Sequence, residues 1–250
     1  DADLVIANDP DADRCAVAVN DQARGWRMLR GDEVGVLLGH YLLRKNSVKG
    51  LRIANSLVSS SLLGKIAIKN GLEFKETLTG FKWISKVENL LFGYEEALGY
   101  CVDAANVNDK DGISAAVIIV SIVAELKEKG LSVSEYLEKI GQEYGFHATD
   151  QISLRFTDLN HIDQLLRKVI EQPPAVLSGH ALVSKENLSQ SKIMPTPGIR
   201  LKYENEIRVI IRPSGTEPKL KCYIEVVAAS KNEAESLLSQ IKQALTKVLT

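Results

Sequence analysis

The stretch LRIANSLVSSSLLGKIAIKNGLEFKETLTGFKWISKVENLLFGY, residues 51–94, decides the fold of this 250-residue chain. It contains three short runs with the character of buried strands, at 51–54, 73–77 and 90–94. A helical segment follows each of the first two runs. The first of these helices ends at Gly71, a residue type suited to that position, and the second is expected over residues 84–89. Strand, loop and helix in repeated alternation predict a mainly parallel sheet with crossover helices.

Three polar loops follow these strands, at 55–61, 79–83 and 95–100. The carboxyl ends of parallel strands meet at one edge of a sheet, so we expect the three loops to lie together. They hold hydroxyls, a lysine, a tryptophan and the carboxylate pair Glu95 and Glu96. Each loop alone is typical of a polar connector, but their common edge predicts a sugar-phosphate site.

Two longer helices flank this stretch. Residues 31–46 predict a helix with Asp32 as the candidate N-cap. Residues 113–129 predict a second helix, and its first half is apolar on nearly every side, which is typical of a buried helix.

The segment Asp9-Pro10-Asp11-Ala12-Asp13-Arg14 follows an apolar run and predicts a metal site. Three carboxylates at alternate positions of an extended loop can converge, and their mutual repulsion favours a cation. Oxygen-only ligands favour Mg²⁺ above other ions. Arg14 adds a positively charged guanidinium group, whose paired N–H donors are suited to binding phosphate.

Other interpretations of this segment remain open. A solvated acidic turn has similar composition. An EF-hand fits poorly, because Arg14 and Asn20 stand where that loop needs glycine and glutamate. A phosphatase of the haloacid-dehalogenase type also places D-x-D after a strand, with Asp9 or Asp11 as nucleophile.

The pattern of predicted strands and helices changes after residues 145–150. Segments at 151–156, 206–211 and 221–227 predict strands, and 159–171 and 231–248 predict amphipathic helices. This pattern indicates a smaller α+β domain with an antiparallel sheet. The loop Arg212-Pro213-Ser214-Gly215-Thr216-Glu217-Pro218-Lys219 offers amides, hydroxyls and positive charge to a phosphate, although a plain hairpin turn has the same composition.

Composition excludes several classes of protein. A net charge of −1 gives no reason to expect nucleic acid or an anionic membrane as a partner. The three cysteines include no C-x-x-C, so neither a zinc site nor a disulfide framework is indicated. The default location is the cytoplasm.

Taken together and in order, these loops resemble motifs of the α-D-phosphohexomutase family, the phosphoglucomutases and phosphomannomutases. Asp9–Arg14 resembles the metal loop, residues 93–100 the sugar-binding loop, and residues 212–217 the carboxy-terminal phosphate loop. Residues 79–83 and 110–112 resemble further family stretches. The resemblance implies that the chain holds Mg²⁺ through Asp9, Asp11 and Asp13. It implies catalytic roles for Arg14 and Lys82, and substrate contacts for Glu95, Glu96, Lys110, Arg212, Ser214, Gly215 and Thr216.

The resemblance also implies a domain plan and an activity. Residues 1–29 would end a metal-binding second domain, residues 30–147 would form a sugar-binding third domain, and residues 148–250 a phosphate-binding fourth domain. The implied reaction interconverts hexose 1- and 6-phosphates through a bisphosphorylated sugar. The family's phosphoserine segment is not in this sequence, so we expect it to lie before Asp1 and the 250 residues alone to be inactive. Ala97 stands where many members have serine, which keeps a phosphopentomutase open. The missing phosphoserine segment keeps a non-catalytic sugar-phosphate-binding module open.

Overall fold

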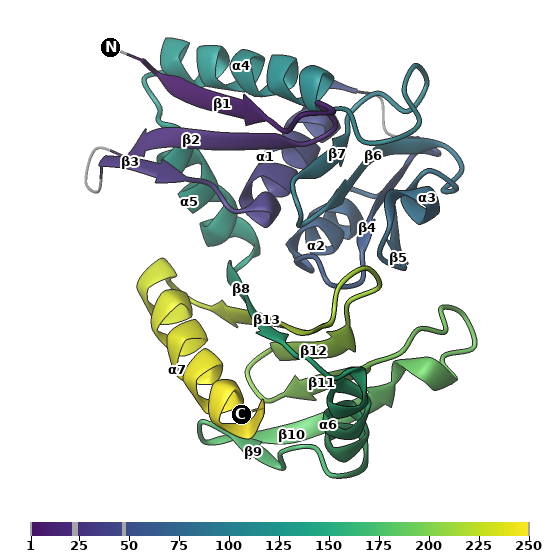
Figure 1. Cartoon of the computed structure of the whole chain (residues 1–250). Helices are drawn as coiled ribbons and strands as arrows, with labels where there is room; N and C mark the ends of the chain where they lie inside the picture. The colour runs from purple at the N-terminus through teal and green to yellow at the C-terminus, as the bar shows by residue number, and fades with distance from the viewer. Residues whose placement is uncertain (1, 22–24, 47–48, 250) are drawn as a thin grey trace. The chain divides into compact units, whose positions relative to one another are not determined.

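The computed structural model describes residues 2–21, 25–46 and 49–249, which form two compact units. The first unit ends at Tyr144 and the second begins at Gly145. Figure 1 shows the elements of both in chain order. Among the described residues, no helix is both long enough and apolar enough to cross a membrane.

The first unit contains two sheets. The elements, in order, are β1 (Leu4–Asn8), β2 (Cys15–Asp21), β3 (Gly25–Met28), α1 (Gly31–Lys45), β4 (Arg52–Ser56), α2 (Leu62–Lys69), β5 (Glu73–Thr77), α3 (Phe81–Ile84), β6 (Leu90–Glu95), β7 (Gly99–Cys101), α4 (Gly112–Glu128) and α5 (Val133–Tyr144). Strands β1, β2 and β3 form an antiparallel sheet, and the other four form a sheet in the order β5-β4-β6-β7. In the latter, β4 pairs in parallel with β5 and β6, and only β7 is antiparallel. The mainly parallel sheet expected from residues 51–94 is therefore confirmed.

Helices cover both faces of the four-stranded sheet. Helices α1 and α2 pack on one face in a core that continues through β2 to α4 and α5. The short helix α3 packs on the other face through Phe81 and Ile84. A Cβ at Gly35 of α1 would lie 2.6 Å from the ring of Tyr94, so this glycine lets α1 lie close to β6. That close contact fixes the first turn of α1 near the carboxyl edge of the sheet.

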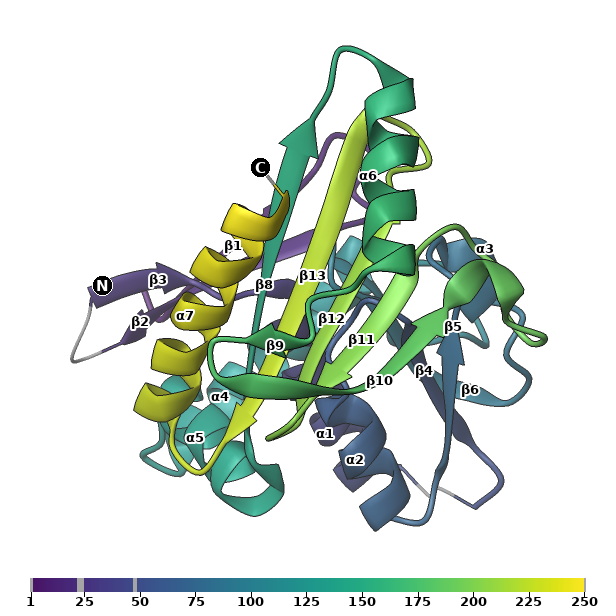
Figure 2. The ribbon, with the colours of Figure 1, turned by 90° about the horizontal axis from the view of Figure 1, so that it is seen from below.

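The second unit is a single sheet with two helices. Its elements are β8 (Phe146–Arg155), α6 (Leu159–Glu171), β9 (Val176–Leu177), β10 (His180–Asn187), the 3₁₀ turn η1 (Leu188–Gln190), β11 (Ile199–Tyr203), β12 (Ile207–Pro213), β13 (Lys219–Ala228) and α7 (Lys231–Leu249). The sheet order is β8-β13-β12-β11-β10-β9, with every pairing antiparallel. Helices α6 and α7 lie on the same face (Figure 2) and share one apolar core with it. The expected α+β architecture is thus confirmed.

Three local expectations were wrong. Helix α3 ends at Ile84 and does not continue to residue 89. Helix α4 is not buried on every side, because Ile113, Val117 and Val120 are 60%, 60% and 51% exposed. The N-cap of α1 is Arg30, whose amide donates to the Glu33 carboxylate at 2.8 Å, and Asp32 lies inside the helix.

Candidate functional site

The loop between β1 and β2 brings Asp9, Asp11 and Asp13 together. One carboxylate oxygen from each lies within 4.8 Å of those from the other two. The main chain turns tightly here, since Ala12 has a φ of 57° and its amide donates to the Asp9 carbonyl at 2.9 Å. Three converging carboxylates form an oxygen donor set of the kind that Mg²⁺ accepts.

Positive charge surrounds this acidic group. The Nζ of Lys110 lies 2.5 Å from Oδ2 of Asp13, and the hydrogen bond between them raises the pKa of Lys110. The Nε of Arg14 lies 3.5 Å from Asp9 and 3.8 Å from Asp13. Desolvation works to raise the pKa of Asp9, but hydrogen bonds from the Arg14 amide and Asp11, together with the Arg14 charge, lower it. The Asp9 carboxylate is therefore held in its charged form.

A buried oxygen with no hydrogen-bond donor, whose ion-pair partner Arg14 lies 3.8 Å away, supports the fit of these residues to a cation. Oδ1 of Asp13 is buried and receives no hydrogen bond from any residue that the structure describes. A buried carboxylate oxygen without a donor is costly, and a metal ion would satisfy it.

The acidic loop lies against the loop predicted to bind sugar, here called the 95–99 turn. The amide of Cys15 donates to the Leu98 carbonyl at 3.1 Å, and Arg14 forms a β-bridge with Gly99. The carboxylate of Glu95 accepts from the Gly80 amide at 2.6 Å, which joins this turn to the loop after β5. The expected clustering of these loops at the carboxyl edge is thus observed.

Lys82 lies on the helix that begins beside Gly80. Its Nζ is 5.6 Å from the centre of the Trp83 ring, and the Nζ of Lys86 is 4.8 Å from the same ring. Trp83 is partly exposed, at 36%. The segment that carries these two cations and the indole begins directly after Gly80, whose amide donates to the Glu95 carboxylate.

Four of the predicted residues, Arg212, Ser214, Gly215 and Thr216, lie in the second unit, in the segment of β12 and the hairpin that joins it to β13. The amide of Ser214 donates to the Lys219 carbonyl at 2.8 Å, and the Thr216 amide approaches the Ser214 hydroxyl at 3.4 Å. Gly215 and Thr216 are exposed at the tip. The Nε of Arg212 is buried, with no hydrogen-bond partner in the described chain. The hairpin therefore combines a guanidinium N–H of Arg212 that has no hydrogen-bond partner in the described chain with a loop of hydroxyl and amide groups.

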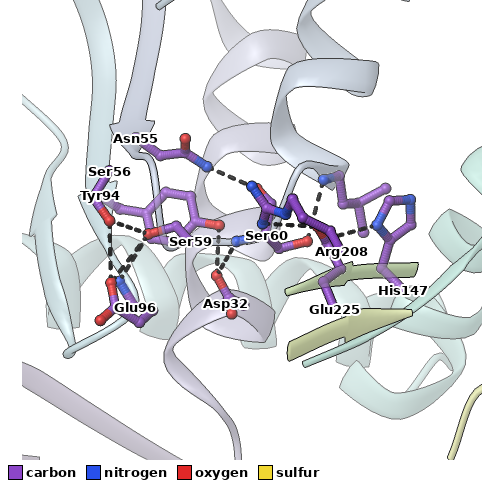
Figure 3. A network of polar contacts seen from close by, with 11 residues as sticks. Asp32, Asn55, Ser56, Ser59, Ser60, Tyr94, Glu96, His147, Arg208 and Glu225 are labelled. Atoms are coloured by element: carbon purple, nitrogen blue, oxygen red, sulfur yellow. Dashed lines mark hydrogen bonds and ion pairs between the residues drawn. The ribbon is translucent and has the colours of Figure 1, made fainter. Parts of the chain in front are cut away.

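The sequence reasoning missed the role of Asp32. Its Oδ1 accepts from the Ser60 amide at 2.7 Å and from the Tyr94 hydroxyl at 2.8 Å (Figure 3). Glu96, for which a substrate contact stays a prediction, accepts hydrogen bonds from the hydroxyls of Ser56 and Ser59 at 3.2 and 3.3 Å. The loop after β4 is thus held by the carboxylates of Asp32 and Glu96. Each carboxylate lies at least 28 positions along the chain from the loop residue that it contacts, so no local sequence pattern predicts these contacts.

Two family models match this chain. "Phosphoglucomutase/phosphomannomutase, alpha/beta/alpha domain III" matches residues 30–144. "Phosphoglucomutase/phosphomannomutase, C-terminal domain" matches residues 168–244. The two models match in the order that the sequence motifs predict.

Curated relatives align over nearly the whole chain. A probable phosphomannomutase of Haemophilus influenzae is 42% identical over 99% of this chain and 51% of its own length. A phosphopentomutase of Homo sapiens is 33% identical over 99% of this chain and 46% of its own length. A glucose 1,6-bisphosphate synthase of Mus musculus is 30% identical over 99% and 45%. The chain therefore spans about half the length of the curated relatives it matches.

Solved structures share the fold. A putative phosphomannomutase from Thermus thermophilus superposes with a TM-score of 0.71 at 20% identity, covering 98% of this chain and 45% of that one. The Aspergillus fumigatus N-acetylphosphoglucosamine mutase, crystallised with glucose 1,6-bisphosphate, superposes at 0.57 with 16% identity over 99% and 49%. The fold, the two family models and the alignments over nearly all of this chain confirm the resemblance: this chain belongs to the phosphoglucomutase/phosphomannomutase family, the α-D-phosphohexomutases.

Proposed function

We propose that this chain supplies the metal- and sugar-phosphate-binding part of an intramolecular phosphotransferase that interconverts hexose 1- and 6-phosphates. The observation that carries the proposal is the acidic triad at one rim, with Arg14 and Lys110 paired to it and Glu95 on the adjoining turn. Metal, phosphate and sugar hydroxyls are the three things that such a reaction must hold.

In this proposal Asp9, Asp11 and Asp13 hold Mg²⁺, which when bound neutralises charge on the transferring phosphoryl group. The guanidinium of Arg14 contacts that group's oxygens, and Glu95 accepts hydrogen bonds from sugar hydroxyls. Lys82 helps to move the proton of the sugar hydroxyl that receives the phosphoryl group. Lys110, beside Asp13, adds positive charge where the phosphate enters.

The overall reaction balances through two transfers. A phosphoserine gives its phosphoryl group to the free sugar hydroxyl, which loses its proton and forms a sugar bisphosphate. The bisphosphate then returns its other phosphoryl group to the serine. No segment resembling the family's phosphoserine loop occurs in these 250 residues, so the proposed reaction requires a donor serine from outside them.

In this proposal the second unit provides residues that bind the phosphate group that is not transferred. Arg212, Ser214, Gly215 and Thr216 are proposed to bind it, and the unused Nε of Arg212 supports this role. Binding energy from a distal phosphate can orient the reacting end of the sugar.

Loss of this arginine should weaken ligand binding without unfolding the chain. We expect Arg212→Ala to lower affinity for glucose 1,6-bisphosphate roughly 10- to 100-fold, because hydrogen bonds between charged groups are removed. Calorimetric titration measures the effect. The matched control is Arg167→Ala, an exposed arginine on α6, which should bind like the wild type. Equal affinities for the two variants would contradict the assignment.

A phosphopentomutase is the second candidate, favoured by Ala97 and by relatives that carry that name. Ala97 is exposed on the 95–99 turn and offers no hydroxyl to a hexose. Parallel titrations with glucose, mannose and ribose 1-phosphates in Mg²⁺ separate the two candidates by relative affinity. A phosphatase would instead form an aspartyl phosphate on Asp9 or Asp11, which mass spectrometry detects.

The activity itself is tested with two proteins. The 250-residue chain should bind sugar phosphates in Mg²⁺ yet show no turnover, because it has no phosphoserine segment. The complete gene product should convert mannose 1-phosphate to the 6-phosphate when primed with glucose 1,6-bisphosphate. Turnover by the 250 residues alone, or binding without turnover by the complete product, would overturn the proposal.

A further inference from the structure

The loop that follows β4, residues 56–60, is held at both ends by acidic side chains (Figure 3). At one end, the amide of Ser60 donates to Asp32 at 2.7 Å, and the Asn55 side chain donates to the Ser60 carbonyl at 2.8 Å. At the other end, the hydroxyls of Ser56 and Ser59 lie 2.9 Å apart and both reach Glu96. We call residues 56–60 the serine loop.

Glu96 is tied to this loop by its main chain as well as its side chain. Its amide donates to the Ser59 hydroxyl at 3.1 Å, and its carboxylate oxygen Oε2 accepts from both serines. On the opposite side, helix α1 leaves no room, because a Cβ at Gly31 would overlap the carbonyl group of Glu96. Glu96 therefore joins three elements, β6, the serine loop and the first turn of α1.

The position of Glu96 determines the position of Glu95. Consecutive residues at a strand end project to opposite sides. While Glu96 points to the serine loop, Glu95 points to the Gly80 amide and the region of Lys82. Movement of Glu96 out of its serine contacts would turn the Glu95 carboxylate away from that region.

The acidic groups around Glu96 make its ionisation unfavourable. Asp32 faces it from α1, Glu95 precedes it on β6, and the buried Tyr100 hydroxyl is near the same charges. Burial, followed by the charges of Asp32 and Glu95, raises the pKa of Glu96 to about 7. The neutral acid is therefore a substantial form at physiological pH.

We propose that Glu96 is a positioning residue whose neutral carboxyl group locks the serine loop to the 95–99 turn and thereby holds Glu95 in place for the sugar. Ionisation of Glu96 loosens both loops and weakens sugar-phosphate binding. The sugar role of Glu95 rests on the proposed function, whereas the coupling of the two loops does not.

Binding is measured by calorimetry with glucose 1,6-bisphosphate and Mg²⁺ at pH 6.5, 7.5 and 8.5. The ratio of wild-type to Glu96→Gln dissociation constants cancels the ionisation of the ligand itself. We expect this ratio to rise between pH 6.5 and pH 8.5, by up to about 25-fold if only the neutral form binds. Glu96→Ala should bind weakly at every pH, because it lacks the contacts that glutamine keeps. Glu138→Gln, an exposed substitution on α5, should titrate like the wild type.

Hydrogen exchange without ligand tests the loop coupling separately. After correction for the intrinsic rate, amides of the serine loop and residues 95–98 should exchange faster at pH 8.5 than at 6.5 in the wild type, and equally at both in Glu96→Gln. A pH-independent result in the wild type overturns the inference, whether or not ligand binds. If this exchange pattern appears but no variant binds the bisphosphate, the proposed function fails and the loop coupling stands.

Discussion

Asp11→Asn is expected to lower the affinity of the chain for Mg²⁺ by on the order of 100-fold and to leave the fold intact. Removing a residue that only hydrogen-bonds to a metal ligand typically lowers metal affinity by about 10- to 100-fold. Asp11 is proposed to be a ligand itself, so its loss should have an effect at the upper end of that range. Asp11 is exposed, and the ion pairs of Arg14 and Lys110 are made with Asp9 and Asp13. The substitution therefore removes one of three converging charges and breaks none of these pairs.

The sign of the stability change distinguishes a metal site from an acidic turn. Without Mg²⁺, Asp11→Asn should be as stable as the wild type or slightly more stable, because repulsion within the triad is reduced. With Mg²⁺ at about 100 times its wild-type dissociation constant, the wild type should gain about 2.7 kcal/mol of unfolding free energy and the variant, with its roughly 100-fold weaker affinity, about 0.4 kcal/mol. Thermal unfolding with and without Mg²⁺ measures both quantities.

Glu138→Gln is the matched control for this experiment. It removes an exposed carboxylate on α5 of the same unit and should respond to Mg²⁺ as the wild type does. A Mg²⁺-induced stabilisation that is the same in Asp11→Asn and the control would mean that the triad is a solvated turn.

The sheet of the first unit could be predicted because its local signals agree with its tertiary environment. β4 is buried along most of its length, and the edge rule for parallel strands placed three distant loops together before any contact was known. In the second unit, the strands predicted at 206–211 and 221–227 correspond to β12 and β13, whereas no strand was predicted at β11, although it alternates buried Ile199, Leu201 and Tyr203 with more exposed residues. β10 has mostly exposed residues and forms through pairing with β11, so its sequence carries no comparable signal.

Other features depend on contacts between distant residues. Asp32 has the residue type and position of an N-cap, but the Ser60 amide and the Tyr94 hydroxyl draw its carboxylate into the domain. Helix α4 is apolar on most sides, yet composition cannot say which side a neighbour covers, and Val117 is exposed. Glu96 looks like a sugar ligand in the motif, whereas the structure turns its carboxylate to two serines.

Gly112→Ala is expected to destabilise the first unit by about 3 kcal/mol and to weaken Mg²⁺ binding together with it. A Cβ at this position would overlap the Arg14 carbonyl oxygen and lie 2.7 Å from the Ala12 carbonyl oxygen. Both are main-chain atoms of the acidic loop, so neither can move without displacing the carboxylates.

The segment that carries Gly112 cannot retreat either. The amide of Gly112 donates to the Ala12 carbonyl at 3.1 Å, and the Asp111 amide donates to the Tyr100 carbonyl at 2.9 Å. The Asp111 side chain caps α4 by accepting from the Ile113 amide at 3.0 Å. A shift of this segment would therefore disturb the helix start, the Lys110 contact with Asp13 and the acidic loop together.

Helix propensity alone predicts the opposite sign, because alanine is favoured over glycine inside a helix by about 1 kcal/mol. Steric overlap of the new Cβ with two main-chain oxygens outweighs that gain and leaves the net loss of about 3 kcal/mol. Urea denaturation gives the stability change and calorimetry the Mg²⁺ affinity. Ile113→Ala, at the next and largely exposed position of the same turn, should change stability by no more than about 0.5 kcal/mol. A Gly112→Ala chain at least as stable as the wild type would show that residues 110–112 do not brace the acidic loop, and the link between the two halves of the candidate site would then have to lie in the Arg14 bridge to Gly99 alone.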